Sequence, residues 1–236
     1  MAVTLHSHTK GTGTNGATTT PTINKTAGGT TTLTVVHVAQ YKGGTLTPPQ
    51  DSQSNLYITA LTGKAGPVET YSKLFYKVNP SCGASHSWTV SNTGIYASFQ
   101  VANFMGTDTS SPYESESGNT SAASASTIAP GSVTPAADGS LVVTGFSWNT
   151  SSSAVATIDG SFVVSDQSVY GAGEGGALAY LLSSSGAANP TWTIAPNTSN
   201  DRSSTLAVFK AAAAGASFLA AVRKPMMQAI QRASVW

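Results

Sequence analysis

The chain has 236 residues, of which only 9% are charged, and its formal net charge is +1. This length accommodates one large all-β domain or two small ones, and it is enough to bury a substantial core. Outside three residues near the C-terminus there is no basic stripe, so we do not expect nucleic-acid binding. Threonine, serine, glycine and alanine fill the gaps between apolar segments. Such a surface is either covered by other chains or simply suited to strands and turns.

Cysteine usage and the N-terminus indicate where the chain is made. Cys82 is the only cysteine, which excludes an intrachain disulfide and is consistent with synthesis in a reducing cytoplasm. The N-terminus lacks a basic region followed by an apolar core, and no segment approaches the roughly 18 apolar residues that span a bilayer. We therefore expect neither a signal peptide nor a membrane partner.

The first half of the chain predicts short strands separated by glycine and proline turns. Residues 1–30 begin with alternating residues and continue into a Gly/Thr-rich run, which predicts an extended N-terminal arm or an edge strand. Residues 106–131 lose apolar periodicity, and we expect a long loop or extended connection there. Between these segments the predicted strands cover residues 31–41, 55–61, 68–78, 85–90 and 95–104.

The second half repeats the order of the first. In each half a tyrosine-containing strand is followed by Asn-Pro, a Trp-Thr strand and a closing strand that contains alanine and phenylalanine. Residues 31–104 and 140–209 therefore predict a two-fold pseudo-repeat. Because each half alone has few apolar residues and no disulfide, we expect one all-β domain over residues 31–210, a jelly-roll-like antiparallel β-sandwich. The strands predicted in the second half cover residues 140–148, 154–158, 162–164, 176–182, 190–194 and 204–210.

The C-terminal segment, residues 211–236, is the only one with helical spacing. Its apolar residues recur on one face, and Pro225 should kink it or divide it into two short helices. So short an amphipathic helix does not fold alone in water, so we expect it to dock on its own domain or on another subunit. The predicted interface residues of this tail are Val222, Met226, Met227, Ile230 and Trp236.

Residue patterns that carry catalysis are sparse. The acidic residues are scattered singly except for Glu114 and Glu116 in the expected loop, and His6 and His8 lack a third metal ligand nearby in the sequence. Two glycine-rich patterns, at residues 11–16 and 171–176, do not lead from a buried parallel strand into a helix. We therefore expect a protein that is not an enzyme and that has no cofactor and no metal. A glycoside hydrolase would need two acids facing one groove, and the sequence nominates no such pair.

A series of short motifs resembles a known group of proteins. The motifs are Leu-x-Val-Val at 33–36, Tyr-x-Val-Asn-Pro at 76–80, Gly-x-Ser-His-x-x-Thr-Val at 83–90, Ser-Val-Thr-Pro at 132–135, Leu-Val-Val at 141–143, Ala-Leu-Ala-Tyr at 177–180, Asn-Pro-Thr-Trp-Thr at 189–193 and Ala-Val-Phe-Lys-Ala at 207–211. Over residues 25–212 this order resembles jelly-roll, lectin-like β-sandwich domains of tailed-phage virion proteins. These motifs are structural, so they indicate fold more than function.

The resemblance implies a place in a virus particle. We expect a non-enzymatic capsid decoration or cement protein, made in the host cytoplasm and located on the capsid surface of the virion. Its partners would be the major capsid protein or other virion proteins and further copies of itself, with a trimer as the expected homo-oligomer. The alternative is a carbohydrate-binding adsorption module of a head or tail fibre, which binds a host-surface glycan. The candidate glycan contacts are Tyr113, Trp148, Asp166 and Tyr170.

Overall fold

The computed structural model of the chain is all-β. It describes residues 2–12, 22–23, 31–41, 46–59, 64–65, 70–83, 86–90, 95–121, 125–150, 153–170, 174–197 and 201–213. Every regular element in these ranges is a β-strand, and the strands pair antiparallel. The same ranges contain no helix that could cross a membrane.

The strands of the two long sheets have eight to eleven residues, except β5 and β6 with two each, and the strands of the small sheets have two to four. They are β1 (Thr4–Thr12), β2 (Thr22–Ile23), β3 (Leu33–Tyr41), β4 (Gln50–Asp51), β5 (Ile58–Thr59), β6 (Lys64–Ala65), β7 (Thr70–Val78), β8 (His86–Thr89), β9 (Ile95–Met105), β10 (Tyr113–Ser121), β11 (Thr127–Ile128), β12 (Ser140–Asn149), β13 (Val155–Ile158), β14 (Val163–Tyr170), β15 (Glu174–Ser184), β16 (Trp192–Ala195) and β17 (Arg202–Phe209).

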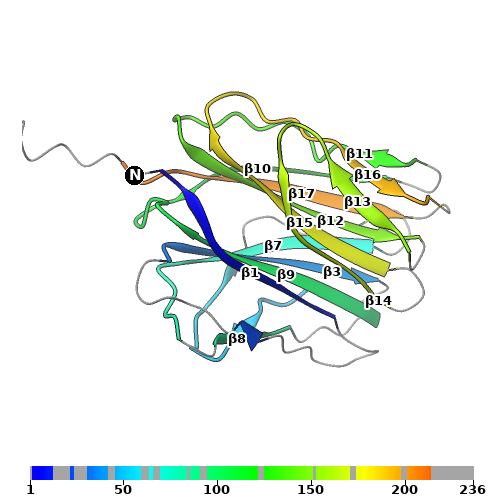
Figure 1. Cartoon of the computed structure of the whole chain (residues 1–236), viewed down its shortest axis with the longest axis horizontal. Helices are drawn as coiled ribbons and strands as arrows, with labels where there is room; N and C mark the ends of the chain where they lie inside the picture. Colours follow the sequence, from blue (N-terminus) through cyan, green and yellow to red (C-terminus); the bar gives the residue numbers. More distant parts are fainter. Residues whose placement is uncertain are drawn as a thin grey trace, which may run out of the picture.

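Two long sheets stack face to face, and each comes from one half of the chain (Figure 1). The first sheet has the order β1-β9-β3-β7-β5, with β6 also paired to β7, and the second has the order β10-β17-β12-β15-β14. Strand β3 packs against β12 and β15, while β7 packs against β12 and β17. The stacked sheets form a sandwich-like arrangement.

Each long sheet also carries a small sheet on its outer face. The orders of the small sheets are β2-β8-β4 in the first half and β11-β16-β13 in the second. In Figure 1 the small sheet that contains β16 lies on one side of the stacked sheets, and β8 lies on the other. Apart from β6, which has no counterpart, the strand order of the second half repeats that of the first. The sequence repeat predicted this for residues 31–104 and 140–209, and the structure extends it to β1 and β2 in the first half and β10 and β11 in the second.

The repeat extends to the pairing register. Leu33 of β3 and Leu141 of β12 face Phe104 and Phe209, respectively, on the neighbouring strand. The edge strands β1 and β10 both contain a register shift near their first residue. In β1 the shift lies between Leu5 and Ser7, and in β10 it lies between Tyr113 and Ser115. Such bulges bend a strand at a defined point, so equivalent bulges indicate that the halves share local geometry as well as strand order.

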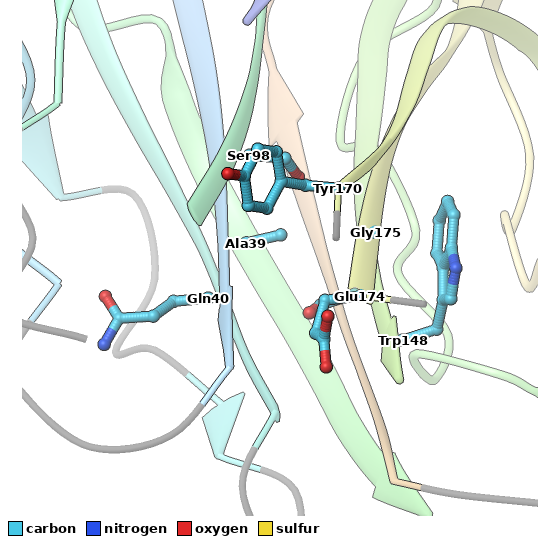
Figure 2. A pocket seen from close by; sticks show the side chains of 8 residues that line it. Ala39, Gln40, Ser98, Trp148, Tyr170, Glu174 and Gly175 are labelled. Atoms are coloured by element: carbon cyan, nitrogen blue, oxygen red, sulfur yellow. The ribbon is translucent and has the colours of Figure 1, made fainter. Parts of the chain in front are cut away.

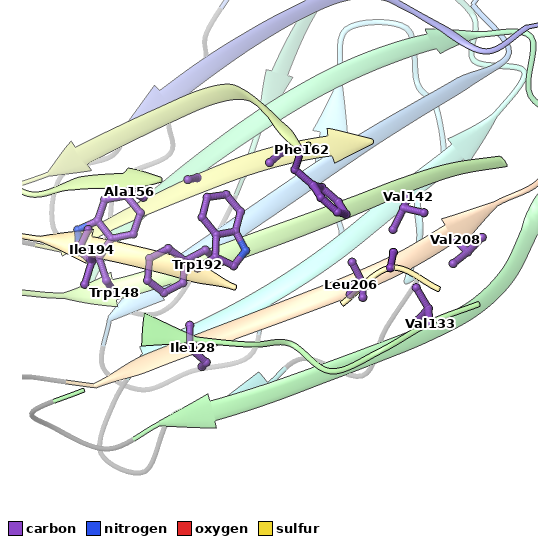
Figure 3. Packing of buried hydrophobic residues seen from close by; sticks show 14 of the residues in the cluster. Ile128, Val133, Val142, Trp148, Ala156, Phe162, Trp192, Ile194, Leu206 and Val208 are labelled. Carbon is purple, nitrogen blue, oxygen red and sulfur yellow. The ribbon is translucent and has the colours of Figure 1, made fainter. Parts of the chain in front are cut away.

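The apolar core has three layers instead of one. One cluster lies between the long sheets, a second lies between the first long sheet and its small sheet around Trp88, and a third lies under the small sheet of the second half around Trp192. Figure 3 shows this third cluster, in which the ring of Phe146 stacks 5.3 Å from that of Trp192. The sequence predicted a meagre core for each half and therefore one jelly-roll-like sandwich made from both. The antiparallel all-β architecture is confirmed, and each half supplies a whole long sheet with an apolar cluster of its own.

The loop predicted for residues 106–131 contains two strands. Strand β10 pairs with β17 along its whole length, and β11 pairs with β16. Strand β10 lies at the edge of its sheet, and none of its residues is fully buried. An edge strand with partly exposed side chains on both faces does not need apolar alternation, so periodicity could not reveal it.

A polar network crosses the space between the long sheets. The imidazole of His37 on β3 is fully buried; its Nδ1 lies 2.7 Å from Oε1 of Gln100, and its Nε2 lies 2.8 Å from Oγ of Ser72. Gln100 donates from Nε2 to Oγ of Ser168 in the other half, and Oγ of Ser72 lies 3.3 Å from Oγ1 of Thr205 there. Burial lowers the pKa of His37 from 6.5 to about 4, since the Gln100 contact offsets only part of the desolvation.

The same histidine fits against a glycine of the other half. A Cβ added at Gly145 on β12 would lie 2.2 Å from Cδ2 of His37. Since His37 is held by two hydrogen bonds, it cannot swing away. Gly145→Ala should therefore cost about 1–3 kcal/mol of unfolding free energy, measured by urea denaturation. At the exposed Gly186 an added Cβ meets nothing within 4 Å, so Gly186→Ala is the matched control. Equal stability of the two variants would contradict this account.

The buried histidine also predicts a pH dependence. The folded state keeps His37 neutral down to about pH 4, whereas the unfolded chain takes up a proton near pH 6.5. Stability is therefore full above pH 6.5 and falls as the pH drops toward 4, by about 3 kcal/mol over that interval. Urea midpoints measured between pH 7 and 4.5 should show this decline in the wild type and a flatter profile in His37→Gln. Parallel profiles would contradict the assignment to His37.

Candidate functional site

An open hollow lies on the outer side of the first half. Its volume is about 460 Å³, and it is lined by Thr47, Pro48, Pro49, Gln50, Asn55, Leu56 and Tyr57. The side chain of Leu56 is 82% exposed, and that of Ile58, two residues on, is 55% exposed. An open hollow beside exposed apolar side chains is the surface feature in this half that best suits contact with another molecule.

A tight turn after β4 builds the wall of this hollow. Asp51 Oδ1 accepts hydrogen bonds from the backbone amides of Gln53 and Asn55, at 3.0 and 2.9 Å. This pattern is an Asx-type turn, in which an aspartate side chain closes the backbone in place of a regular turn. The side chain of Asn55 then donates to Asp51 Oδ2 and to the carbonyl of Ser81, which ties the turn to the segment after β7.

A buried group of aromatic and ionisable side chains supports the turn from below. Tyr57 donates its hydroxyl proton to Asp51 Oδ2 at 2.8 Å, and Trp88 Nε1 donates to the Tyr57 hydroxyl at 2.5 Å. Nε2 of His86 lies 3.0 Å from Asp51 Oδ2, and the two side chains are 0% exposed. The imidazole of His86 stacks on Trp88 with centroids 3.8 Å apart. The ring N–H does not point along the line to the carboxylate, so this contact is electrostatic more than a directed hydrogen bond.

These contacts determine the charge of the cluster. Burial by itself would raise the pKa of Asp51, but the contacts with His86, Asn55 and Tyr57 outweigh it and lower the pKa to about 2. Desolvation and the neighbouring carboxylate raise the pKa of Tyr57 well above its ordinary value. The cluster therefore holds an ionised carboxylate that is shielded from solvent. Since neither Asp51 nor His86 is exposed, the pair stabilises the wall of the hollow and does not meet a substrate.

Two of the predicted glycan contacts have roles in packing. Trp148 on β12 is 0% exposed and lies beneath the small sheet, where its ring centroid is 5.2 Å from that of Phe146. Because Trp148 is buried, it cannot be one of the exposed aromatic side chains that a glycan-binding site needs. Tyr113 on β10 is partly buried, stacks on Tyr76 with centroids 5.8 Å apart and donates its hydroxyl to Glu116.

The other two predicted contacts lie on β14. Asp166 has a 13% exposed side chain, and its Oδ2 lies 2.7 Å from Nδ1 of His8, which joins the edges of the two long sheets. Tyr170 is partly buried at the end of the strand. Strands β10 and β14 form opposite edges of one sheet, so the fold does not bring Tyr113 together with Asp166 and Tyr170 in one groove.

Other predicted sites are not assembled or lie outside the described residues. Among the described residues, no three side chains of histidine, cysteine, aspartate or glutamate gather in a way that could hold a metal ion. His6 and His8, which the sequence analysis set aside as a metal site, do not form one: His6 lies in the bulge of β1, and His8 pairs with Asp166. The tail residues Val222, Met226, Met227, Ile230 and Trp236 lie outside the described residues.

Comparison with known proteins adds no assignment. No family model matches the chain, and neither a curated protein nor a solved structure matches it.

Sequence reasoning did not identify the Asp51 cluster or the hollow beside it. Asp51, Tyr57, His86 and Trp88 come from two segments roughly thirty residues apart, and pairing of β4 with β8 brings them together. The Pro-Pro-Gln-Asp segment before the turn was the available signal, because aspartate after proline commonly starts a side-chain-closed turn.

The cluster predicts a stability loss when its charge is removed. Asp51→Asn puts an amide against the hydroxyl of Tyr57 and the amide of Asn55, so donors face donors, and it should cost about 2–4 kcal/mol of unfolding free energy.

Because its folded pKa is lowered from 3.8 to about 2, Asp51 stabilises the folded state fully above pH 3.8, and this contribution is lost as the pH falls toward 2. Urea denaturation at pH 7, 4 and 2.5 should show that loss in the wild type and a smaller one in Asp51→Asn. The exposed Asp138→Asn should stay within about 0.5 kcal/mol of the wild type. An equally mild Asp51→Asn would refute the proposed role of the cluster.

Proposed function

We propose that this chain is a non-enzymatic structural protein of a phage virion, which binds the outer surface of the head shell as a decoration or cement protein. The motif resemblance over residues 25–212 suggests the class of protein. The low charge of the chain supports it further, since 9% charged residues leave much of the surface suited to contact with other chains.

One observation carries the proposal: exposed apolar residues occupy equivalent positions in the two halves. Ile58 on β5 pairs with Tyr76, and Val163 on β14 pairs with Tyr180. Both tyrosines hold the same place in their long sheets, and the two aliphatic side chains are 55% and 52% exposed. Apolar side chains on edge strands are surfaces that another protein chain can cover. Two such sites per chain suit a protein that bridges neighbouring subunits of a lattice.

The jelly-roll description is part of this proposal, and it applies to each half separately. The long-sheet order β1-β9-β3-β7 and the small-sheet order β2-β8-β4 follow the alternation of strands between two sheets that two nested Greek keys produce. The second half repeats both orders. The chain would then carry two jelly-roll units joined through their long sheets, and would assemble through its tail into a trimer.

The glycan alternative has one specific observation in its favour. The hollow at residues 47–57 is open to solvent and combines the amide side chain of Gln50 with the exposed aliphatic side chain of Leu56. Sugar rings present an apolar face and a polar rim, and this lining offers contacts to both. The carbohydrate-binding module would therefore use the hollow in place of the four residues that sequence reasoning nominated.

Purified particles provide the test. The chain should be found by mass spectrometry in gradient-purified virions from a host that produces it, at a fixed ratio to the major shell protein. Ile58→Glu, which places a charge on the apolar contact, should reduce incorporation at least about tenfold. Thr59→Glu, at the neighbouring exposed position, should incorporate within about twofold of the wild type. Absence of the wild-type chain from intact particles would refute the proposal. Binding of the free chain to an immobilised glycan, lost in Gln50→Ala, would favour the alternative.

A further inference from the structure

Two hollows of the molecule differ in whether another chain can enter them. The narrow one lies between the long sheets, and its gaps are too small for a water molecule. Figure 2 shows the side chains of Gln40, Ser98 and Glu174 around it pointing to separate places, so they form no common site. The open hollow at residues 47–57 has a volume of about 460 Å³, which is ordinary for a binding pocket. Of the two, only the open hollow can take in a side chain from outside.

The open hollow has an apolar rim. Leu56 is 82% exposed, and Pro48 is also exposed. None of the described residues that line the hollow is charged, and Gln50 and Asn55 supply amide groups. Exposed apolar side chains beside a hollow mark a place that another molecule covers. The hollow therefore suits an apolar segment of a protein chain.

The chain leaves the sandwich at the same end of the molecule. The turn beside the hollow is tied to the segment after β7, where Asn79 donates from Nδ2 to the carbonyl of Thr109. The neighbouring Thr107 forms a bridge with Ala211, which follows β17. The described residues end at Ala213, so the tail, residues 214–236, begins beside this group of contacts.

Charge at this end complements that of the tail. Hydrogen bonds from Ser111 and Ser110 lower the pKa of Asp108 to about 2, so its carboxyl is ionised at neutral pH. The tail contains three basic residues and no acid. Electrostatic attraction therefore favours contact between the two. Among the described residues at this end, the acids outnumber the lysines: Asp108, Glu114, Glu116 and Asp138 lie there with Lys77 and Lys210.

The tail is long enough to reach a neighbouring molecule. Its first predicted interface residue is Val222, and the eight residues from 214 to 221 span at most about 25–30 Å. A closed trimer has head-to-tail contacts, so each chain needs two different surfaces that fit each other. The tail and the open hollow are such a pair. Because the tail begins at the end that holds the hollow, a three-fold axis there brings each tail to the hollow of the next copy.

We propose that the tail of one copy docks in the open hollow of the next copy, so that three copies close a ring. The apolar residues of the tail cover Leu56, and its basic residues face the acids at this end. This inference rests on the proposed function, in which the chain assembles as a trimer through its tail, and it adds the surface that the tail binds.

The mass of the full chain in solution tests the proposal. At micromolar concentration, light scattering should give the mass of three 23.9 kDa chains. Leu56→Glu and Met226→Glu each place a charge in the apolar contact, so each should raise the dissociation constant of the trimer at least about tenfold while the far-UV circular dichroism stays unchanged. Val155→Glu, at an exposed aliphatic position on β13, should remain a trimer. A monomeric wild type, or a trimer of unchanged affinity in Leu56→Glu, would overturn the proposal.

A crosslink separates a neighbour's tail from the chain's own. Cys82 is the only cysteine, and it lies in the segment that is tied to the hollow. After mild oxidation, Gln231→Cys should give a covalent trimer on a non-reducing gel, because two cysteines per chain can link three chains into a ring. With Cys82→Ser added, no species larger than a dimer should form. A disulfide within one chain, or no crosslink at all, would count against docking on a neighbour.

Analysis of particles keeps the two proposals apart. If the wild-type chain is a monomer but occurs in virions at a fixed ratio, the docking proposal fails and the proposed function stands. If the chain forms the crosslinked trimer but is absent from particles, the proposed function fails and the docking stands.

Discussion

The contact between His37 and Gly145 sets how closely the two halves approach. The strands β3 and β12 hold equivalent places in their sheets and pack against each other, so a strictly symmetric sequence would put a side chain on both sides of the same space. The imidazole occupies the position that a Cβ of residue 145 would need. The first half therefore contributes the imidazole ring, and the second half contributes the space left by the missing side chain of Gly145. The other strands of each sheet are then positioned by their hydrogen-bond registers with β3 and β12. A fold with near-symmetric halves thus depends on one unsymmetric pair.

The space between the sheets changes character along its length. At one end, leucine and phenylalanine side chains from both halves form a continuous apolar cluster. Farther along the strands, His37 and Gln100 belong to a hydrogen-bonded network between the sheets. Apolar packing tolerates small shifts, whereas a buried imidazole with two partners does not, because any slip would leave polar atoms unsatisfied. The apolar end therefore contributes apolar burial, and the polar end selects one alignment. Beyond this network, Oγ of Ser98 and Oε2 of Glu174 are buried without a hydrogen-bond partner.

Sequence reasoning was reliable where both faces of a strand are buried. The strands predicted at residues 31–41 and 140–148 correspond to β3 and β12, which lie between a partner sheet and a small sheet. It failed for β10, whose residues are half exposed at a sheet edge. It also nominated Trp148 as an exposed aromatic side chain. The strands that cover it, β13 and β16, were predicted, but their packing over β12 was not. The Asp51 cluster depends on which strands become neighbours, and local pattern carries no information on that.

The bulges in the edge strands have a consequence for solubility. A chain with few charges lacks the lysines and glutamates that usually keep exposed sheet edges from pairing with other molecules. Here β1, β10 and β14 each contain a register shift, and in β14 the shift ends at Asp166, an acid directed inward to His8. A bulge twists the free edge out of line with any straight strand that approaches it. Backbone shape, in place of charge, therefore protects these edges from pairing with strands of other molecules. The faces of the molecule can then carry few charges without causing aggregation.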